Sequence, residues 1–290
     1  MIQIDSKAFW ISEWQRAADG SPFHNLYPDE KLIWDMSAST YDSGTKKNNQ
    51  RVETVLEHLE RMNFWRGDHP KRILDIGSGT GVFTIPLALC GGCVDALDIS
   101  EKMNHVLRQK SEVYHLTDIR ILHEDFRKLS LADHTYDLVI GSMNPCLYEP
   151  ENFLKAMALS RDVMIYIGIT SGNRPSDEKP LAELLTGRKS GHNGSNHIIY
   201  PLNLLLSMGL HPTIDYVDYQ WESKEAPNPS KTKFLRQFEH LKNNVTEMEQ
   251  VISDYVDRHT ENGLYVQRSS GTMGIVVCQV KTQSDNGVYS

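Results

Sequence analysis

The sequence has few cysteines, no long hydrophobic run and no excess of positive charge. Four cysteines in 290 residues do not make a disulfide framework. No segment is long and apolar enough to span a bilayer, and residues 1–5 lack the basic start and apolar core of a secretion signal. The net charge of −8 argues against a surface that holds nucleic acid, which requires clustered Lys and Arg. We therefore expect a cytoplasmic protein that binds neither nucleic acid nor membrane.

The sequence also lacks a convincing metal motif, an internal repeat and a heptad pattern. Cys90 and Cys93 have metal-ligand spacing, but no second pair accompanies them. Gly91 and Gly92 between them predict the end of a helix instead. His192 and His197 lie in a Gly/Asn-rich stretch, and histidines in such a polar loop are typical of a solvated surface, so no metal site is predicted.

One apolar run is followed directly by a turn in which every second residue is glycine. Residues 72–76 predict a buried parallel strand, and apolar residues at helical intervals over 80–89 predict a helix. The turn between them contains Gly77, Ser78, Gly79 and Gly81. Glycine permits a sharp reversal and lets a ligand lie against the backbone, close to the first amides of the helix. Asp75 ends the strand at the edge of the sheet where ligands bind in α/β folds.

A second acid closes the next apolar run. Asp98 follows residues 94–97, and a carboxylate at this strand tip can accept both hydroxyls of a ribose. A dinucleotide fingerprint requires glycine at the sixth position of G-x-G-x-x-G, where this chain has Val82. A nucleotide-like cofactor other than nicotinamide is therefore favoured.

Four ordered motifs resemble those of the class I S-adenosylmethionine-dependent methyltransferases, of the type that acts on small molecules. The resemblance covers residues 72–145 and rests on the acid and glycine turn, on Asp98, on Asp125 and on the aromatic-Asp pair that opens the strand 136–140. It implies S-adenosyl-L-methionine as the cofactor, with Asp98 on the ribose, Asp125 facing the adenine amino group and Phe126 as a wall for the ring. Ile99, Met103 and Ser142 complete the predicted cofactor site.

The resemblance also suggests catalytic candidates. Asn144, in the segment 142–148, resembles the Asn of the Asn-Pro-Pro-aromatic motif of methyltransferases that act on amino groups, although Cys146 and Leu147 replace the second Pro and the aromatic residue. A simple turn is an equally open interpretation of Asn144. Trp34-Asp35 and Tyr41-Asp42 resemble a W-D…Y-D pattern of small-molecule methyltransferases, in which the tyrosine helps to close over the cofactor. Tyr41 is therefore a second candidate, and His24 is a candidate base.

The order of predicted elements indicates an α/β fold. Strands that alternate with helices predict a Rossmann-like, mostly parallel sheet with helices on both faces and an antiparallel last strand. Helices are expected over 7–18, 29–41 and 51–64, strands over 213–221 and 274–280, and two further helices over 231–241 and 245–258. The polar stretch 171–196, around a short helical piece, is interpreted as a surface connection.

These elements divide the chain into four parts. We expect an N-terminal helical cap over 1–68, a cofactor-binding core over 69–221, a helical insertion or lid over 222–265 and a C-terminal strand and tail over 266–290. The insertion is alternatively a dimerisation or purely structural appendage, and the oligomeric state is open, with a homodimer as one option.

The sequence thus predicts methyl transfer to a small molecule by in-line displacement. Two alternatives remain: a methyltransferase acting on protein or RNA, and a regulator that binds the cofactor without catalysis.

Overall fold

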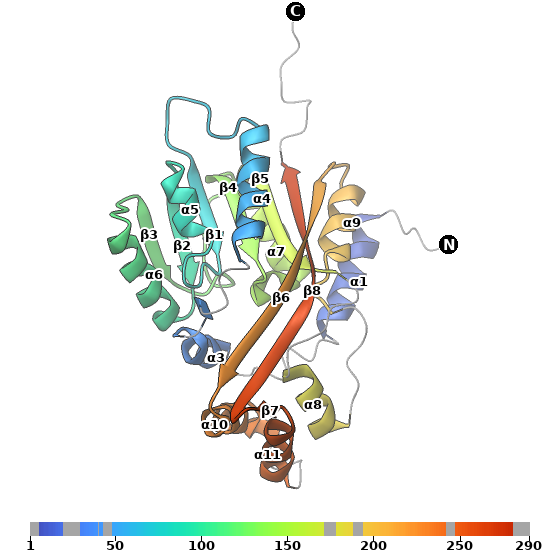
Figure 1. The fold of residues 1–290 in the computed structure, drawn as a ribbon. Helices are drawn as coiled ribbons and strands as arrows, with labels where there is room; N and C mark the ends of the chain where they lie inside the picture. The colour runs from blue at the N-terminus through green and yellow to red at the C-terminus, as the bar shows by residue number, and fades with distance from the viewer. Residues whose placement is uncertain are drawn as a thin grey trace, which may run out of the picture.

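The centre of the molecule is a sheet in which five parallel strands are followed by one antiparallel strand and then by a last strand that runs in the direction of the first five (Figure 1). The computed structural model describes residues 6–19, 30–39, 41–42, 48–170, 178–187, 194–241 and 247–280. The strands run in the order β3-β2-β1-β4-β5-β8-β6, and β7 pairs with β8. Their bounds are β1 Arg72–Ile76, β2 Cys93–Asp98, β3 Ile119–His123, β4 Tyr136–Ser142, β5 Ser160–Ile169, β6 Thr213–Glu225, β7 Thr260–Glu261 and β8 Leu264–Gln279. The predicted Rossmann-like fold is confirmed, including the antiparallel strand β8 between β5 and β6.

The strand order reverses between β1 and β4, which is the place where open α/β sheets bind ligands. β2 and β3 continue the sheet on one side of β1, and β4 and β5 continue it on the other. The carboxyl ends of β1, β2 and β4 therefore surround a natural crevice. Any cofactor site predicted from β1 and β2 belongs at this edge.

Helices cover both faces of the sheet. Their bounds are α1 Lys7–Asp19, α3 Glu30–Ser37, α4 Asn48–Arg61, α5 Thr84–Leu89, α6 Glu101–Val113, α7 Pro150–Leu159, α8 Glu178–Thr186, α9 Ile199–Ser207, α10 Pro227–Gln237 and α11 Met248–Arg258, with short 3₁₀ helices η2 Pro145–Tyr148 and η3 Glu239–Leu241. Successive residues of a strand point to opposite faces of the sheet, so the neighbouring residues Ile73 and Leu74 of β1 belong to different cores. One core packs on α1, α7 and α9, and the other packs on α4 and α5.

The three helices described before β1, namely α1, α3 and α4, occupy three different places. On α1, Trp14 is fully buried against α7 and β5, and its indole nitrogen donates to the Ser195 carbonyl oxygen over 2.8 Å. On α4, Val55 and Leu59 are buried on the opposite face of the sheet. In turn, α3 lies beside the carboxyl ends of the strands, where it contacts α6. Of the expected N-terminal helices, α3 is therefore the one placed to cover a cofactor.

The isolated cysteine pair marks a helix end, as the sequence predicts. At the end of α5, Gly91 has a φ of +89° and its amide donates to the Ala88 carbonyl. The amide of Gly92 donates to the Leu87 carbonyl, which completes a Schellman cap. The two glycines thus explain the spacing of Cys90 and Cys93.

The strands β6 and β8 are longer than the sequence predicts. We expected 213–221 and 274–280, but the pairing continues from Thr213↔Val277 to Glu225↔Tyr265. The result is a two-stranded ribbon that extends beyond the parallel sheet (Figure 1). The central part of β8 is half-buried on both faces and contains serine, threonine and glycine, so it lacks the apolar pattern by which buried strands are predicted.

The tip of the ribbon carries a second, smaller core, which we call the head. It is formed by α8, α10, α11 and the first residues of β8, and its buried side chains include Leu181, Phe234, Ile252 and Tyr265. The domain boundaries placed at 221/222 and 265/266 fall inside β6 and β8, and α8 joins the head from the stretch we interpreted as a surface connection. Within the described ranges, no helix combines the length and apolar character needed to cross a membrane.

Candidate functional site

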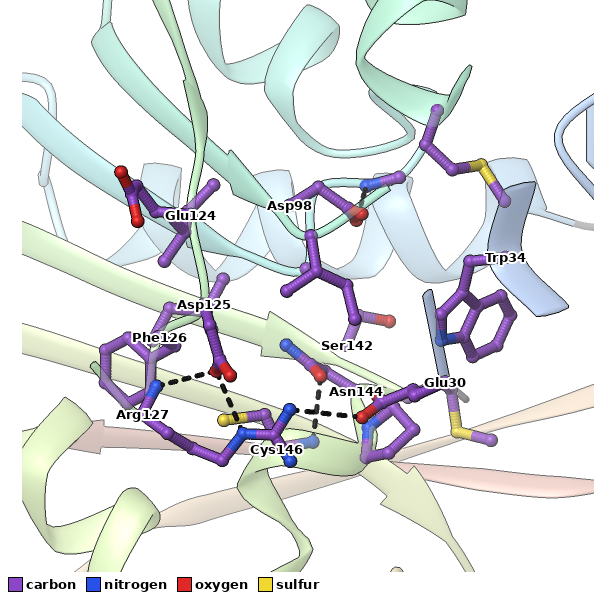
Figure 2. Close-up of a pocket in the computed structure, with 18 of the residues that line it drawn as sticks. Glu30, Trp34, Asp98, Glu124, Asp125, Phe126, Arg127, Ser142, Asn144 and Cys146 are labelled. Carbon is purple, nitrogen blue, oxygen red and sulfur yellow. Dashed lines mark hydrogen bonds and ion pairs between the residues drawn. The ribbon is translucent and has the colours of Figure 1, made fainter. Parts of the chain in front are cut away.

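A pocket opens at the carboxyl ends of β1, β2 and β4 (Figure 2). Most of the residues predicted for the cofactor and the reaction line it: Tyr41, Gly77, Gly79, Asp98, Ile99, Met103, Asp125, Phe126, Ser142 and Asn144. They come from strand ends and turns that are far apart in the sequence. The structure therefore brings these residues together at the edge where the sheet order reverses.

Three predicted residues lie behind the pocket instead of lining it. Asp75 is 2% exposed and accepts a hydrogen bond of 2.6 Å from the Thr84 hydroxyl. Burial raises the pKa of Asp75 to about 6. Ser78 is buried, and Gly81 has a φ of +89° in a position where a Cβ would meet Leu107 at 2.4 Å. These residues shape the turn from behind, and His24 lies outside the described residues.

The glycine turn and the turn after β4 are in contact. Gly77 has a φ of +71°, and a Cβ there would lie 2.4 Å from Nδ2 of Asn144. Asn144 is the N-cap of η2, and its Oδ1 accepts from the Cys146 amide over 3.0 Å. Met143 has a φ of +51°, which is uncommon for a residue with a side chain and turns the backbone sharply after β4. The Asn144 oxygen thus serves the local backbone, while its nitrogen lies over Gly77.

Asp98 is held at the tip of β2 by two backbone amides. Its Oδ2 accepts from the Gly79 amide over 2.9 Å, and its Oδ1 accepts from the Ser100 amide over 2.8 Å. Burial raises the pKa of Asp98, the two amides lower it, and the negative charges of Glu30 and Asp35 raise it further. The two amides hold the carboxylate in one orientation but do not offset the full cost of burying its charge. It is therefore suited to accept further hydrogen bonds from a ligand.

Two acids anchor the N-terminal segment over the pocket. Asp35 accepts from the Ser100 hydroxyl over 2.6 Å at the start of α6. Asp42 accepts from the Thr80 hydroxyl over 2.7 Å and forms an ion pair of 2.6 Å with Lys110.

These anchors place the two aromatic residues that precede them in the wall of the pocket. The rings of Trp34 and Tyr41 lie edge to face, with their centroids 6.5 Å apart. The sequence pattern W-D…Y-D drew attention to its aromatic residues. In the structure, it is the two acids of the pattern that anchor this segment.

An arginine bridges the rim of the pocket. Nε of Arg127 lies 2.9 Å from Asp125 Oδ1, and NH2 lies 3.3 Å from Glu30 Oε2 (Figure 2). Burial alone would raise the pKa of Asp125, but the bonds from Arg127 hold it below its usual value. Arg127, Glu30 and Glu124 line the pocket and were missed by the sequence reasoning, although Glu124 and Arg127 adjoin the predicted residues Asp125 and Phe126.

The described wall of the pocket is predominantly acidic. Four carboxylates line it, those of Glu30, Asp98, Glu124 and Asp125, against one guanidinium, that of Arg127. Such a wall disfavours a polyphosphate and favours a ligand that carries positive charge.

A buried arginine stands behind the pocket. Arg51 is 5% exposed, and its NH1 donates to the Ser142 hydroxyl over 3.1 Å. The guanidinium also lies over the Phe83 ring, 5.5 Å from its centroid. Burial lowers the pKa of Arg51, and a hydrogen bond with Tyr41 opposes this shift. Arg51 therefore links α4 to two residues of the pocket wall.

The strand order and the position of the pocket agree with the class I methyltransferase core that the sequence motifs predict. Residues 73–164 match a protein family described as "Methyltransferase domain". The matched segment contains β1 to β4, the glycine turn and Asp98. This match confirms the class that the sequence motifs predict for the core.

Individual relatives are more distant. The chain is 29% identical over 119 residues to a demethylmenaquinone methyltransferase of a Geobacillus species, covering 34% of this chain and 51% of that protein. It is 25% identical over 158 residues to an uncharacterised protein of Haemophilus influenzae, covering 53% and 58% of the two chains. The chain thus spans just over half the length of these relatives. A magnesium protoporphyrin IX methyltransferase from Synechocystis, solved with bound S-adenosylhomocysteine, shares 17% identity with a TM-score of 0.48, covering 79% of this chain and 81% of that one.

Proposed function

We propose that this protein is an S-adenosylmethionine-dependent methyltransferase that acts on a small molecule. The observation that carries the proposal is the Asp98 carboxylate, fixed by the amides of Gly79 and Ser100 inside a matched methyltransferase domain. When bound, this cofactor supplies a methyl group already activated by a sulfonium charge, so that the transfer is an in-line displacement.

The residues of the pocket fit this cofactor. Asp98 offers two oriented oxygens at a strand tip, where a ribose needs acceptors for two hydroxyls. Gly77 and Gly79 leave backbone without a Cβ at the pocket wall. The excess of carboxylates suits a ligand with a sulfonium and an amino group better than one with phosphates. Asp125 and Phe126 are proposed to border the adenine.

The chain contributes alignment and the exclusion of water. Trp34 and Tyr41, anchored through Asp35 and Asp42, cover the side of the pocket opposite the sheet. Holding the acceptor close to attack distance in a dry site supplies much of the rate of such a displacement. A neutral amine acceptor needs no base, whereas a hydroxyl must lose its proton to one.

The described pocket narrows the choice of catalytic groups. Burial raises the pKa of Cys146 to about 12, which makes this thiol a poor base and a poor nucleophile at neutral pH. Asn144 uses its oxygen to cap η2, so we propose that it shapes the pocket wall and donates through its nitrogen. Tyr41 remains the proposed side chain closest to the reaction.

A small-molecule acceptor agrees with the composition of the chain. The net charge of −8 and the acidic wall of the described pocket disfavour RNA as the acceptor, because RNA binding requires clustered positive charge. The Geobacillus relative is named for demethylmenaquinone, which is a small molecule. These two observations favour a small acceptor over a macromolecular one.

Isothermal titration calorimetry with S-adenosylmethionine tests the proposal. We expect binding to the wild type and at least a tenfold loss of affinity in Asp98→Asn, since hydrogen bonds to a charged acceptor contribute about 1.5–3 kcal/mol each. Asp95→Asn is the matched control, because Asp95 lies on the same strand and binds Arg120 and Tyr136 outside the pocket.

Three outcomes would count against parts of the proposal. Absence of binding to the wild type would refute the cofactor. Equal affinity in Asp98→Asn would refute the ribose assignment. Tight binding without formation of S-adenosylhomocysteine, across a panel of amine and hydroxyl acceptors, would favour the regulator over the enzyme.

A further inference from the structure

A second cavity lies between α3 and the helical head. It has a volume of about 250 Å³, which corresponds to roughly eight water molecules at 30 Å³ each. Leu32, Ile33 and Met36 of α3 form one wall, and residues of α10 and η3 form the other. Figure 1 shows that α3 and α10 are neighbours although nearly two hundred residues separate them in the chain. The cavity is of a size for a small molecule.

The two walls are chemically mismatched. The α3 wall is apolar, and Leu32 is 44% exposed. The other wall presents Lys233, Arg236 and Gln237 of α10, which follow at intervals of three and one residues and so share one helix face, together with His240 of η3. Phe234, one residue after Lys233, lies on the adjacent side of α10 and is buried in the head. The apolar side chains of one wall therefore cannot form hydrogen bonds or ion pairs with the charged and polar side chains of the other.

The charged groups of this wall are available to a ligand. Lys233 and Arg236 form no ion pair within the part of the chain that the structure describes. Among the described residues that line the cavity, Glu239 is the one acid, so positive charge predominates there. An anionic group that enters the cavity would therefore lie close to two positive charges, those of Lys233 and Arg236.

A buried amide supplies an independent observation. Gln237 is 8% exposed, and its Nε2 has no hydrogen-bond partner among the described residues. A buried donor without an acceptor destabilises the folded state, which makes it uncommon unless a ligand or water completes it. Because Gln237 lines the cavity, an acceptor oxygen placed there would satisfy it.

We propose that this cavity is a binding site for a small apolar acid. The carboxylate accepts from Gln237 and lies against Lys233 and Arg236, while the hydrocarbon part covers Ile33 and Met36. Such an acid would cover the exposed apolar side chains of α3 and neutralise the positive charge of the opposite wall. The site is distinct from the proposed cofactor pocket, and binding there does not depend on the proposed function.

The position of α3 connects the two sites. Ile33 and Met36 face the second cavity, whereas Trp34 lines the cofactor pocket. A ligand that bridges α3 and α10 would therefore hold the helix that covers the cofactor. Binding of the acid is accordingly expected to strengthen S-adenosylmethionine binding, and by linkage the effect is reciprocal.

The test uses three probes with one hydrocarbon chain and different charge. Octanoate, octan-1-ol and octyltrimethylammonium are titrated calorimetrically into the full chain without cofactor. We expect octanoate to bind at least tenfold more tightly than octan-1-ol, and the cation not to bind. Gln237→Leu and Arg236→Glu should each weaken octanoate binding at least tenfold, whereas Arg258→Glu on α11, outside the cavity, should leave it unchanged.

Each other result would overturn the proposal. Equal affinity for the three probes would mean a non-specific apolar surface, and unchanged affinity in Gln237→Leu and Arg236→Glu would place octanoate elsewhere. No binding of octanoate to the wild type would remove the site altogether. Since cofactor is absent from this titration, its outcome is separate from that of the proposed methyltransferase activity.

Discussion

The contact between the glycine turn and the turn after β4 makes Gly77→Ala a quantitative test of the pocket. An alanine at a φ of +71° occupies a left-handed conformation that costs about 1–2 kcal/mol. Its Cβ would lie 2.4 Å from Nδ2 and 2.7 Å from Cγ of Asn144, so the side chain must move. Moving it breaks the cap bond to the Cys146 amide, which contributes about 1 kcal/mol. We therefore expect a total loss of about 2–3 kcal/mol.

Gly91→Ala is the matched control for the backbone contribution. Gly91 has a φ of +89°, but a Cβ there meets nothing within 4 Å. Both substitutions restrict the unfolded chain equally, so this effect cancels in the comparison. Gly77→Ala should thus be less stable than Gly91→Ala by about 1 kcal/mol, which corresponds to roughly 2 °C in melting temperature at this chain length.

Differential scanning calorimetry of four variants completes the test. In an Asn144→Ala background the clash is largely removed, so Gly77→Ala should cost no more than Gly91→Ala does. Calorimetric titration should show weaker S-adenosylmethionine binding in Gly77→Ala and unchanged binding in Gly91→Ala. Equal melting temperatures for the two single variants, or an unchanged cost in the Asn144→Ala background, would refute the contact as the reason for glycine.

Three further predictions follow from the surroundings of the pocket. Asp42→Asn removes the ion pair with Lys110 that anchors the Tyr41 turn, so calorimetry should show about fivefold weaker S-adenosylmethionine binding, and equal binding would contradict the anchor. The folded state raises the pKa of Asp75 to about 6, so folding takes up a proton between about pH 4 and pH 6, and ionisation above that range costs up to roughly 3 kcal/mol. Asp75→Asn should therefore gain stability relative to the wild type between pH 4.5 and pH 7.5 in thermal melts, and parallel pH profiles would disprove this. Iodoacetamide at pH 8 should modify the exposed Cys90 and spare Cys146, whose pKa burial raises to about 12; similar labelling of both by peptide mass spectrometry would contradict this.

The parallel core was predictable because its signals are local. Each of β1, β2 and β4 is a short apolar run, and the glycines after β1 have positive φ values that few other residues adopt. Asp98 could be placed at a strand tip for the same reason. These features are fixed by neighbouring residues and require no knowledge of distant contacts.

The ribbon and the head were not predictable in the same way. The outer part of β6, residues 222–225, consists of polar and charged side chains, and the middle of β8 is half-buried on both faces, so neither segment carries the apolar alternation by which a strand is predicted. The segment of α8 stands within a polar stretch, and nothing in its own residues indicates what it packs on, yet Leu181 is fully buried against α10 and α11. Its partners lie some fifty or more residues away in the chain.

The candidate site was partly predictable. Motifs located the pocket and most of its lining residues, which remain predictions until ligand binding is measured. The bridge from Arg127 to Glu30 joins a loop to a distant helix, and no local pattern signals it. Likewise, the sequence favoured Tyr41 over its neighbour Asp42, because anchoring depends on Thr80 and Lys110, which are brought close only by the fold.

The most direct measurement is a crystal structure of the protein with S-adenosylhomocysteine bound. The proposal predicts both ribose hydroxyls within about 2.5–3.0 Å of the Asp98 carboxylate oxygens, and the sulfur directed toward Tyr41 and Asn144. A ligand bound with its ribose away from Asp98, or outside the pocket at the carboxyl ends of β1, β2 and β4, would contradict the proposed function.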